Sequence, residues 1–304
     1  MYTWISRYFI PVFILLVLSW SSAFPVVKIG LSQSPPLLFA GLRTFFGGLF
    51  LLLPACLWGG KLRVSQMWPY CLWSALFFVI LFFGLQTYAV YYLPSGLTAV
   101  LIYLQPILVG LFARIWLKES LTWSKSLGLI LGFAGVFFVS SEGVFGSLSL
   151  IGVLLGVGAA LSWAIGTVYF KRIQERVSLL WLIAGQFIMG GLVILASSLV
   201  FERWTEASWN VTFWLSILYS ALFGISLAWV LYLALIQQGE VSRMSANMFL
   251  VPLMSVLMGS LFLKEPVSLF LVLGGGLILA GIYLVNRRSS PDASRESEMT
   301  QKFS

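Results

Sequence analysis

The residues that do acid–base chemistry or bind metals are few in this chain and lie outside its deep apolar segments. Its 304 residues include no His, and the two cysteines, Cys56 and Cys71, lie in apolar stretches without metal-site spacing. Every Asp and Glu falls in a tail, in a connection or at the end of an apolar segment. We therefore predict no catalytic residues, no metal site and no cofactor, and we expect that the protein is not an enzyme.

The polar side chains that do lie deep in apolar segments are neutral. Gln86, Gln105 and Asn247 form hydrogen bonds but do not take up or release protons near neutral pH. One interpretation is that these amides contact a bound molecule. The alternative is that they form hydrogen bonds between helices.

Composition places these residues in a lipid bilayer. The chain is 60% hydrophobic and 9% charged, with a mean hydropathy of +0.99, which excludes a soluble globular protein. A helix needs about 20 apolar residues to cross the hydrocarbon core. The sequence therefore predicts an all-α membrane protein. Its ten transmembrane helices are expected near residues 9–29, 37–58, 68–91, 95–117, 123–141, 150–170, 180–201, 211–236, 242–263 and 268–286.

The basic residues predict how the helices are oriented. The net charge of +8 is spread over short connections, a distribution that reports membrane orientation and not a nucleic-acid partner. If the N-terminus is cytoplasmic, only Lys28, Arg43, Arg203 and Lys264 remain on the outer side. We therefore predict that both termini are cytoplasmic. Residues 1–8 form a cytoplasmic N-terminus, and 288–304 form a disordered cytoplasmic tail.

An internal repeat organises the chain. The stretch Leu104–Val139 is repeated in Leu250–Val285 at a constant offset of 146 positions. Each copy contains a proline in mid-helix, a Leu-Lys-Glu sequence (117–119 and 263–265) and a Gly-rich segment. Because each half has an odd number of spans, residues 9–141 and 150–287 should form two five-helix repeats inserted in opposite directions. Inverted repeats are typical of transporters that work by alternating access.

The two repeated prolines, Pro106 and Pro252, each remove one helix hydrogen bond. The carbonyl groups of Ile102 and Met248 then lose their usual partners near mid-span. The functional interpretation is a pair of kinked helices that line a substrate site and flex at the kinks. The alternative is a kink that only improves packing.

Aligning the two halves places aromatic, amide and hydroxyl groups on matching helical stripes, which predicts an aromatic-walled central cavity with a few hydrogen-bonding groups. The bland alternative is strong, because aromatic residues make up 16% of the chain and many pack or form interfacial belts. The candidate substrate-binding residues are Trp20, Ser21, Lys28, Gln86, Tyr103, Gln105, Trp163, Thr167, Trp229, Tyr232 and Asn247.

Charged residues near the ends of the spans have two interpretations. Lys28, Lys171 and Arg43 either attract a substrate carboxylate or extend toward lipid headgroups, and we favour the second for Lys171. Glu119 and Glu265 follow helix C-termini and suggest a gate latch. We prefer the plainer interpretation, in which each is a turn residue held by neighbouring amides or an adjacent Lys. The repeated glycines predict close helix packing.

These features together resemble the EamA-type transporters of the drug/metabolite transporter superfamily. The resemblance covers about residues 10 to 287. It rests on the inverted pair with its proline and Leu-Lys-Glu patterns, and on Trp20-Ser21-Ser22-Ala23-Phe24 with Lys28, Phe39-Ala40-Gly41-Leu42-Arg43 and Ser162-Trp163-Ala164. It implies ten helices around a central cavity and export of amino acids or related metabolites. The small multidrug relatives in this superfamily use a membrane-embedded Glu that this chain lacks.

The sequence therefore predicts a secondary transporter of small amphipathic metabolites, most simply aromatic or other neutral amino acids. The missing intramembrane carboxylate favours a facilitator or exchanger over a proton antiporter. The alternatives are an ion-coupled metabolite or drug exporter, a channel-like pore, and an intramembrane enzyme. We expect a monomer or homodimer, a small-molecule substrate, the lipid bilayer as surroundings and no nucleic acid. The expected location is the cytoplasmic membrane of a bacterium.

Overall fold

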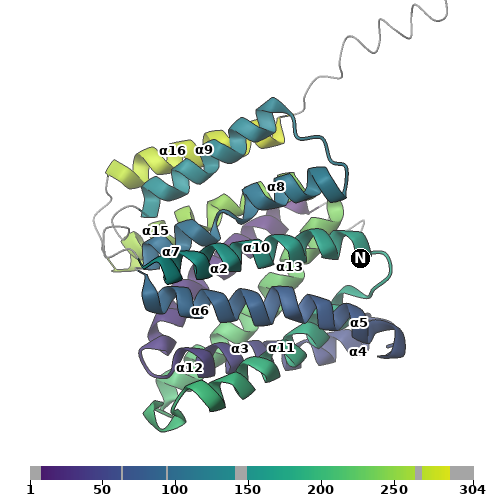
Figure 1. Ribbon diagram of the computed structural model, residues 1–304, viewed down its shortest axis with the longest axis vertical. Coiled ribbons are helices and arrows are strands. Elements are labelled where there is room, and N and C mark those ends of the chain that lie inside the picture. Colours follow the sequence, from purple (N-terminus) through teal and green to yellow (C-terminus); the bar gives the residue numbers. More distant parts are fainter. Residues whose placement is uncertain (1–7, 63, 94, 141–148, 264–268, 288–304) are drawn as a thin grey trace, which may run out of the picture.

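The computed structural model describes residues 8–62, 64–93, 95–140, 149–263 and 269–287. The described residues form ten helices that are long and apolar enough to cross a membrane, as predicted (Figure 1). Spans one to five are α2 (Phe9–Leu31); α3 (Pro36–Phe50) with α4 (Leu52–Trp58); α5 (Val64–Ala75), η1 (Leu76–Leu81) and α6 (Phe82–Tyr92); α7 (Ser95–Ile102) and α8 (Gln105–Trp116); and α9 (Trp123–Ser140). Spans six to ten are α10 (Leu150–Ile173); α11 (Leu179–Phe201); α12 (Val211–Tyr219), η4 (Ser220–Leu227) and α13 (Ala228–Gln238); α14 (Val241–Ala246), η5 (Asn247–Phe249) and α15 (Leu250–Leu263); and α16 (Leu269–Asn286). A short 3₁₀ turn, η3 (Trp204–Glu206), follows span seven.

Local sequence signals start several of these helices. Ser149 accepts a hydrogen bond from the Gly152 amide at the start of α10, at 3.3 Å, and Asn210 accepts one from Phe213 at the start of α12, at 2.9 Å. Pro36 occupies the first turn of α3, where the missing amide hydrogen costs no helix bond. These caps satisfy backbone donors that have no partner within their own helix.

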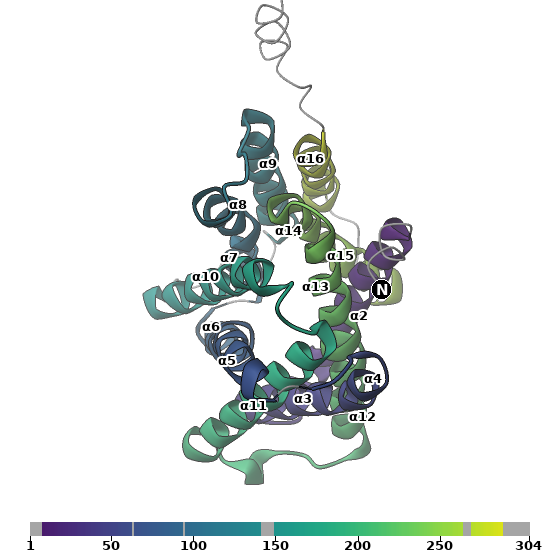
Figure 2. The same cartoon turned by 90° about the vertical axis from the view of Figure 1, so that its right-hand side faces the viewer.

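The two halves of the chain pack against each other in a symmetric pattern. Figures 1 and 2 both place α9 and α16 side by side at one end of the molecule, and α3 and α11 toward the other end. Between them, α6 packs on α10 as η4 and α13 pack on α2, and α8 packs on α10 as α15 packs on α2. If each span of the first half is exchanged with the corresponding span of the second half (one with six, two with seven, and so on), the same pairs of spans remain in contact. This is the packing expected of two related five-helix units.

Glycines bring α9 and α16 into backbone contact. A Cβ atom added at Gly128 would lie 2.6 Å from the Gly281 carbonyl oxygen, and one at Gly135 would lie 2.6 Å from that of Gly274. Real Cβ atoms do not approach oxygen so closely, so these positions require glycine. The Gly-rich segments therefore pack helices closely against each other within one chain, as the repeated glycines predicted.

The fourth and ninth spans are interrupted just before their prolines. Helix α7 ends at Ile102, two turn residues follow, and α8 begins at Gln105, one residue before Pro106. In the ninth span, the 3₁₀ turn η5 separates α14 from α15, which contains Pro252. The sequence predicted a bend at these points. Because proline has no amide hydrogen to donate to the preceding turn, the interruption falls on the residues before it.

The third and eighth spans contain π-helical segments that the sequence did not predict. Segment η1 covers Leu76–Leu81 and η4 covers Ser220–Leu227, and the repeat offset of 146 places one on the other. A π-helical segment bonds residues five apart instead of four. A side chain from the opposite unit bonds to one carbonyl in each segment: Trp20 Nε1 to Gly224 at 3.1 Å, and Ser162 Oγ to Phe77 at 2.8 Å.

Replacing Gly281 with Ala should destabilise the protein by about 1–3 kcal/mol, because the added methyl group meets the Gly128 carbonyl at 2.6 Å. Gly276→Ala in the same helix is the matched control, since no described atom lies within 4 Å of its Cβ position. Both variants gain the same helix propensity, about 1 kcal/mol. The thermal midpoint in detergent should fall only for Gly281→Ala, and equal midpoints would contradict the contact.

Candidate functional site

Aromatic rings from both units meet at the centre of the bundle. Trp229 of α13 lies among the other rings, with centroid distances of 5.0–6.4 Å, and is only 1% exposed. We call this set the aromatic cluster. Its members are Trp20, Phe78, Phe82, Phe83, Trp163, Phe187, Trp229 and Tyr232.

A small polar network lies against the aromatic cluster. The Tyr232 hydroxyl is 2.9 Å from Thr167 Oγ1, and Gln105 Nε2 donates to Tyr232 Oη at 3.3 Å. All three side chains are fully buried. The Gln105 Oε1 atom is enclosed and accepts no hydrogen bond from the residues that the structure describes. The network therefore presents an unused acceptor beside the rings, at the point where α8 begins after its break.

Two residues of the first span attach this site to the backbone of the other unit. Trp20 Nε1 donates to the Gly224 carbonyl in η4, and Ser21 Oγ donates to the Val251 carbonyl at 3.2 Å. Val251 directly precedes Pro252, so this hydrogen bond lies next to the interrupted ninth span. The predicted site residues Trp20, Ser21, Gln105, Trp163, Thr167, Trp229 and Tyr232 thus lie together.

Other predicted site residues are placed elsewhere. Asn247 accepts a hydrogen bond from Asn286 Nδ2 at 2.7 Å and so connects η5 to α16 instead of joining the network. Gln86 is half-buried in α6, and its enclosed Oε1 has no hydrogen-bond partner among the described residues. Tyr103 is buried at the break in the fourth span. The side chain of Lys28 and residue Glu265 lie outside the described residues.

The sequence reasoning did not identify three phenylalanines of the aromatic cluster, Phe78, Phe82 and Phe187, whereas Phe83 lies on the helical stripe that aligns with Trp229 in the other half. Phe78 of η1 lies 5.0 Å from Trp229 between ring centroids, and Phe187 reaches the same ring from α11 at 5.3 Å. Among 25 phenylalanines, nothing in residue type or spacing marks these. The one structural feature that marks Phe78 is that it lies in η1, a π-helical segment that recurs as η4 in the other half.

The Lys171 ammonium group is hydrogen-bonded to backbone carbonyls of the protein. Its Nζ donates to the carbonyls of Ile236, Gln237 and Gly239 at 2.9–3.2 Å, at the C-terminus of α13. A cation there is stabilised by the partial negative charge of the helix end. This arrangement leaves Lys171 little capacity to bind a substrate carboxylate. It also differs from the headgroup contact that we favoured, because the ammonium bonds to helix carbonyls instead.

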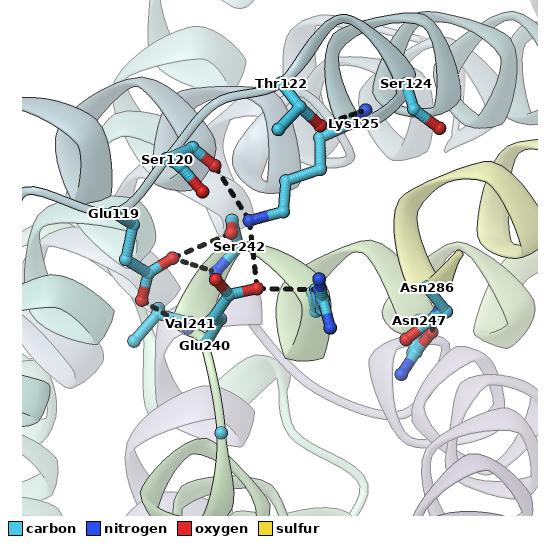
Figure 3. Close-up of polar contacts among 12 residues, drawn as sticks. Glu119, Ser120, Thr122, Ser124, Lys125, Glu240, Val241, Ser242, Asn247 and Asn286 are labelled. Atoms are coloured by element: carbon cyan, nitrogen blue, oxygen red, sulfur yellow. Dashed lines mark hydrogen bonds and ion pairs between the residues drawn. The ribbon is translucent and has the colours of Figure 1, made fainter. Parts of the chain in front are cut away.

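Glu119 bonds to the start of a helix in the opposite unit (Figure 3). Its carboxylate accepts from the amides of Val241 and Ser242 at 2.7 and 3.2 Å and from the Ser242 hydroxyl at 2.7 Å. Lys118 precedes it with a φ of +59°, a left-handed conformation that costs a non-glycine residue about 1–2 kcal/mol. The amides that hold Glu119 are therefore not its neighbours in sequence, as our plainer interpretation assumed, but lie 122 residues away.

An ion-pair group lies beside this carboxylate. Lys125 Nζ of α9 is 2.9 Å from Glu240 Oε2 and donates to the Ser120 carbonyl at 2.8 Å, and Arg243 Nε also contacts Glu240 at 2.6 Å. Lys125 is 2% exposed, so the pair it forms is shielded from water. We call Glu119, Lys125, Glu240, Val241 and Ser242 the first clamp (Figure 3).

A second carboxylate joins the units at the opposite end of the bundle. Glu202, after α11, accepts from the amides of Leu37 and Leu38 at 2.7 and 2.8 Å, at the start of α3. Burial raises the pKa of this carboxyl above its usual value, and the two amide hydrogen bonds oppose that shift. Nearby, Asn210 donates to Gln33 Oε1 at 2.9 Å. Each end of the bundle is therefore closed by an acid that caps a helix of the other unit.

Comparison with known proteins identifies the relatives of this chain. The profile described as the EamA-like transporter family matches residues 8–141 and again 150–287. The uncharacterized transporter YvbV of Bacillus subtilis (strain 168) is 42% identical over 287 residues, or 94% of each chain. YoaV of the same organism, also named an uncharacterized transporter, is 30% identical over 88% of this chain and 92% of its own.

More distant similarity extends to other bacteria and to a solved structure. The uncharacterized inner membrane transporter YedA of Escherichia coli (strain K12) is 28% identical over 89% of this chain and 88% of its own. A crystal structure with 21% identity superposes with a TM-score of 0.79, covering 90% of this chain and 95% of the other. That structural match establishes the shared fold and nothing about the ligand.

Replacing Tyr232 with Phe should destabilise the protein by about 1–2 kcal/mol, because Thr167 and Gln105 lose a buried hydrogen-bond partner. The control is Tyr283→Phe, which removes the same hydroxyl from a side chain that is 67% exposed on α16 and should change stability by less than about 0.5 kcal/mol. Thermal midpoints in one detergent give the comparison. Equal midpoints for the two variants would show that the network contributes nothing.

Proposed function

Because this chain belongs to the EamA-like transporter family of the drug/metabolite transporter superfamily, we propose that it carries a small amphipathic metabolite by alternating access. The expected substrates are neutral amino acids with aromatic or other apolar side chains. The proposed site is the aromatic cluster together with Gln105, Thr167 and Tyr232. The two five-helix units, residues 9–141 and 150–287, would then move relative to each other as inverted repeats.

The meeting of aromatic rings and neutral polar groups between the two units is the observation that carries this proposal. The rings offer an apolar surface for a hydrophobic side chain, while hydroxyl and amide groups offer hydrogen bonds to a polar head. The enclosed Gln105 Oε1 supports the assignment, because a buried acceptor without a partner is costly unless a ligand or water satisfies it.

The placement of acids supports a facilitator or exchanger. The acids that the structure describes, Glu119, Glu175, Glu202, Glu206 and Glu240, all lie in connections. Proton-coupled carriers commonly rely on a carboxylate or His at membrane depth. We therefore propose that the substrate moves down its own gradient or exchanges against a second substrate molecule. The alternative, coupling to protons or sodium, is tested by the flux experiment below.

The two carboxylate contacts between the units suggest how access alternates. The first clamp joins the units at the end that the basic residues place in the cytoplasm, and Glu202 joins them at the other end. With both contacts formed and Trp229 almost fully enclosed, the arrangement corresponds to an occluded state. Opening toward either side requires one acid to release its helix.

The same orientation places both termini in the cytoplasm and leaves Glu202 at the outer surface. The relative YedA is named an inner membrane transporter, which supports the cytoplasmic membrane of a bacterium as the location. The named residues of the proposed site all come from one chain, and we expect a monomer or a homodimer.

Exchange in liposomes tests the proposed function. Purified protein in vesicles preloaded with unlabelled L-phenylalanine should take up labelled L-phenylalanine in a saturable, stereoselective way without an imposed pH or sodium gradient. L-Leucine should compete, and sugars and nucleosides should not. Uptake that requires either gradient would contradict a facilitator or exchanger mechanism. Single-channel conductance would indicate a pore instead of a carrier.

Replacing Glu119 with Gln should open the end of the bundle that carries the first clamp, because α14 loses a charged cap. A thiol at the buried Ser245→Cys, in a background with Cys56→Ala and Cys71→Ala, reports this opening through its rate of maleimide labelling. The rate should rise about tenfold, as expected for a change of about 1.4 kcal/mol.

The matched control is Glu175→Gln, which removes the same charge from an exposed position at the same end of the bundle. Its labelling rate should equal that of the parent. If Glu119→Gln also labels at the parent rate while remaining folded, the Glu119 contact is not a gate.

A further inference from the structure

Arg43 occupies an unusual position within the second span. It lies in α3 seven residues after Pro36, which at about 1.5 Å per residue places its Cα about 10 Å along the helix axis. Phe39 precedes it by one helical turn and faces the same side of α3. The guanidinium lies 5.8 Å from the centroid of the Phe39 ring and 5.0 Å from that of Phe83, so it sits between two rings from different spans.

These rings belong to the protein interior. Phe39 is fully buried in a small core with Phe213 and Ile217, and Phe83 is 5% exposed within the aromatic cluster. A side chain that extends toward lipid headgroups leaves the protein core along the outer surface of its helix. Arg43 instead points between two buried aromatic groups, which is a different arrangement from the headgroup contact that the sequence left open.

The Arg43 guanidinium has no polar partner in the part of the chain that the structure describes. It forms no hydrogen bond or ion pair there, and its Nε atom is enclosed. A guanidinium carries five N–H donors, and contact with ring faces satisfies none of them. Intramembrane cations are normally paired with an acid or with carbonyl groups.

Lys125, which is buried, and Lys171, which is half-buried, show how this protein satisfies the hydrogen-bond donors of two other cations. Lys171 bonds to three carbonyl oxygens, and Lys125 bonds to Glu240 and to the Ser120 carbonyl. Both ammonium groups therefore have hydrogen-bond partners within the protein and need no ligand to supply them. Arg43 alone of these three cations is positioned by aromatic rings while its hydrogen-bond donors stay unused.

The free donors adjoin the proposed substrate site. Phe83, which contacts the guanidinium, is itself 6.2 Å from Trp229 and 4.9 Å from Phe82 between ring centroids. Arg43 therefore adds a positive charge at one edge of the aromatic cluster. The chemical group that fits a planar guanidinium is a carboxylate, which accepts two parallel N–H bonds.

We propose that Arg43 binds the carboxylate of the transported molecule while the aromatic cluster holds its apolar part. This inference rests on the proposed function and narrows the substrate class to amphipathic compounds that carry a free carboxylate, with or without an amino group. Amines of the same apolar group lack the oxygen pair that Arg43 requires, and esters lack its negative charge. A lipid phosphate is the other oxyanion that could bind the guanidinium, and the experiment separates the two.

The experiment measures how three compounds compete with labelled L-phenylalanine for exchange in vesicles of neutral phosphatidylcholine. The competitors are L-phenylalanine, 3-phenylpropionate and L-phenylalanine methyl ester. In the wild-type protein the two carboxylates should compete at concentrations about tenfold or more below the ester, because the ester lacks a charge-assisted hydrogen bond. An ester that competes as well as the acids would overturn the proposal without any variant.

The variants assign this selectivity to one side chain. Arg43→Gln should raise the half-competing concentrations of both carboxylates about tenfold or more and leave that of the ester within about twofold. Arg43→Lys should lie between, because an ammonium keeps the charge but not the planar pair of donors. Arg114→Gln, which removes the same charge from an exposed position on α8, should match the wild type. An Arg43→Lys protein with wild-type selectivity would also overturn the proposal.

The remaining outcomes distinguish the causes of failure. If the wild type exchanges none of the three compounds, the proposed function fails. If it exchanges L-phenylalanine but Arg43→Gln shifts all three competitors equally, the role of Arg43 in carboxylate binding is overturned. Adding anionic phosphatidylglycerol should leave the Arg43→Gln effect unchanged, whereas an effect that appears only with this lipid would assign the guanidinium to a lipid phosphate.

Discussion

The structure depends on one constraint: inside a bilayer, each backbone carbonyl that leaves the regular helix must find a partner within the protein. In this chain the partners come from the opposite unit. Trp20 of the first unit bonds to the Gly224 carbonyl in the π-helical segment of the second, and Ser162 of the second bonds to the Phe77 carbonyl in that of the first. Each unit thus completes the hydrogen bonding of the other, so the helix irregularities and the interface between the units form one arrangement.

This arrangement explains why the irregular segments lie at the centre of the molecule. Phe78 of the π-helical segment η1 contacts Trp229, which lies just after η4, and Gln105 at the break before Pro106 contacts Tyr232. Outside this centre, regular helices pack through glycines, as α9 and α16 do with backbones in contact. Rigid, closely packed pairs therefore frame a region where the helices deviate from regular geometry. Such a division is suited to a transporter whose units move about a fixed site.

The charged side chains also differ between the ends and the centre of the bundle. The described acids lie at the ends of the bundle, where Glu119 and Glu202 cap helices of the opposite unit. The described centre holds rings, amides and hydroxyls, with Arg43 at its edge. A carboxylate at an end can leave the helix terminus that it caps and bind water instead, which costs little free energy because water is close by. A charge near the centre has no such alternative, so it is stabilised only by protein or ligand.

The sequence by itself determined the ten spans, the repeat and the lack of His and deep acids, because hydropathy, spacing and residue type are local properties. The sequence also identified most of the residues that lie at the centre, for example Trp20 and Trp163, which occupy matching positions in the two halves. Only the tertiary structure decided that Asn247 pairs with Asn286, that Glu119 caps a helix 122 residues away, and where the π-helical segments fall. Those outcomes depend on contacts between distant segments, which no local pattern specifies.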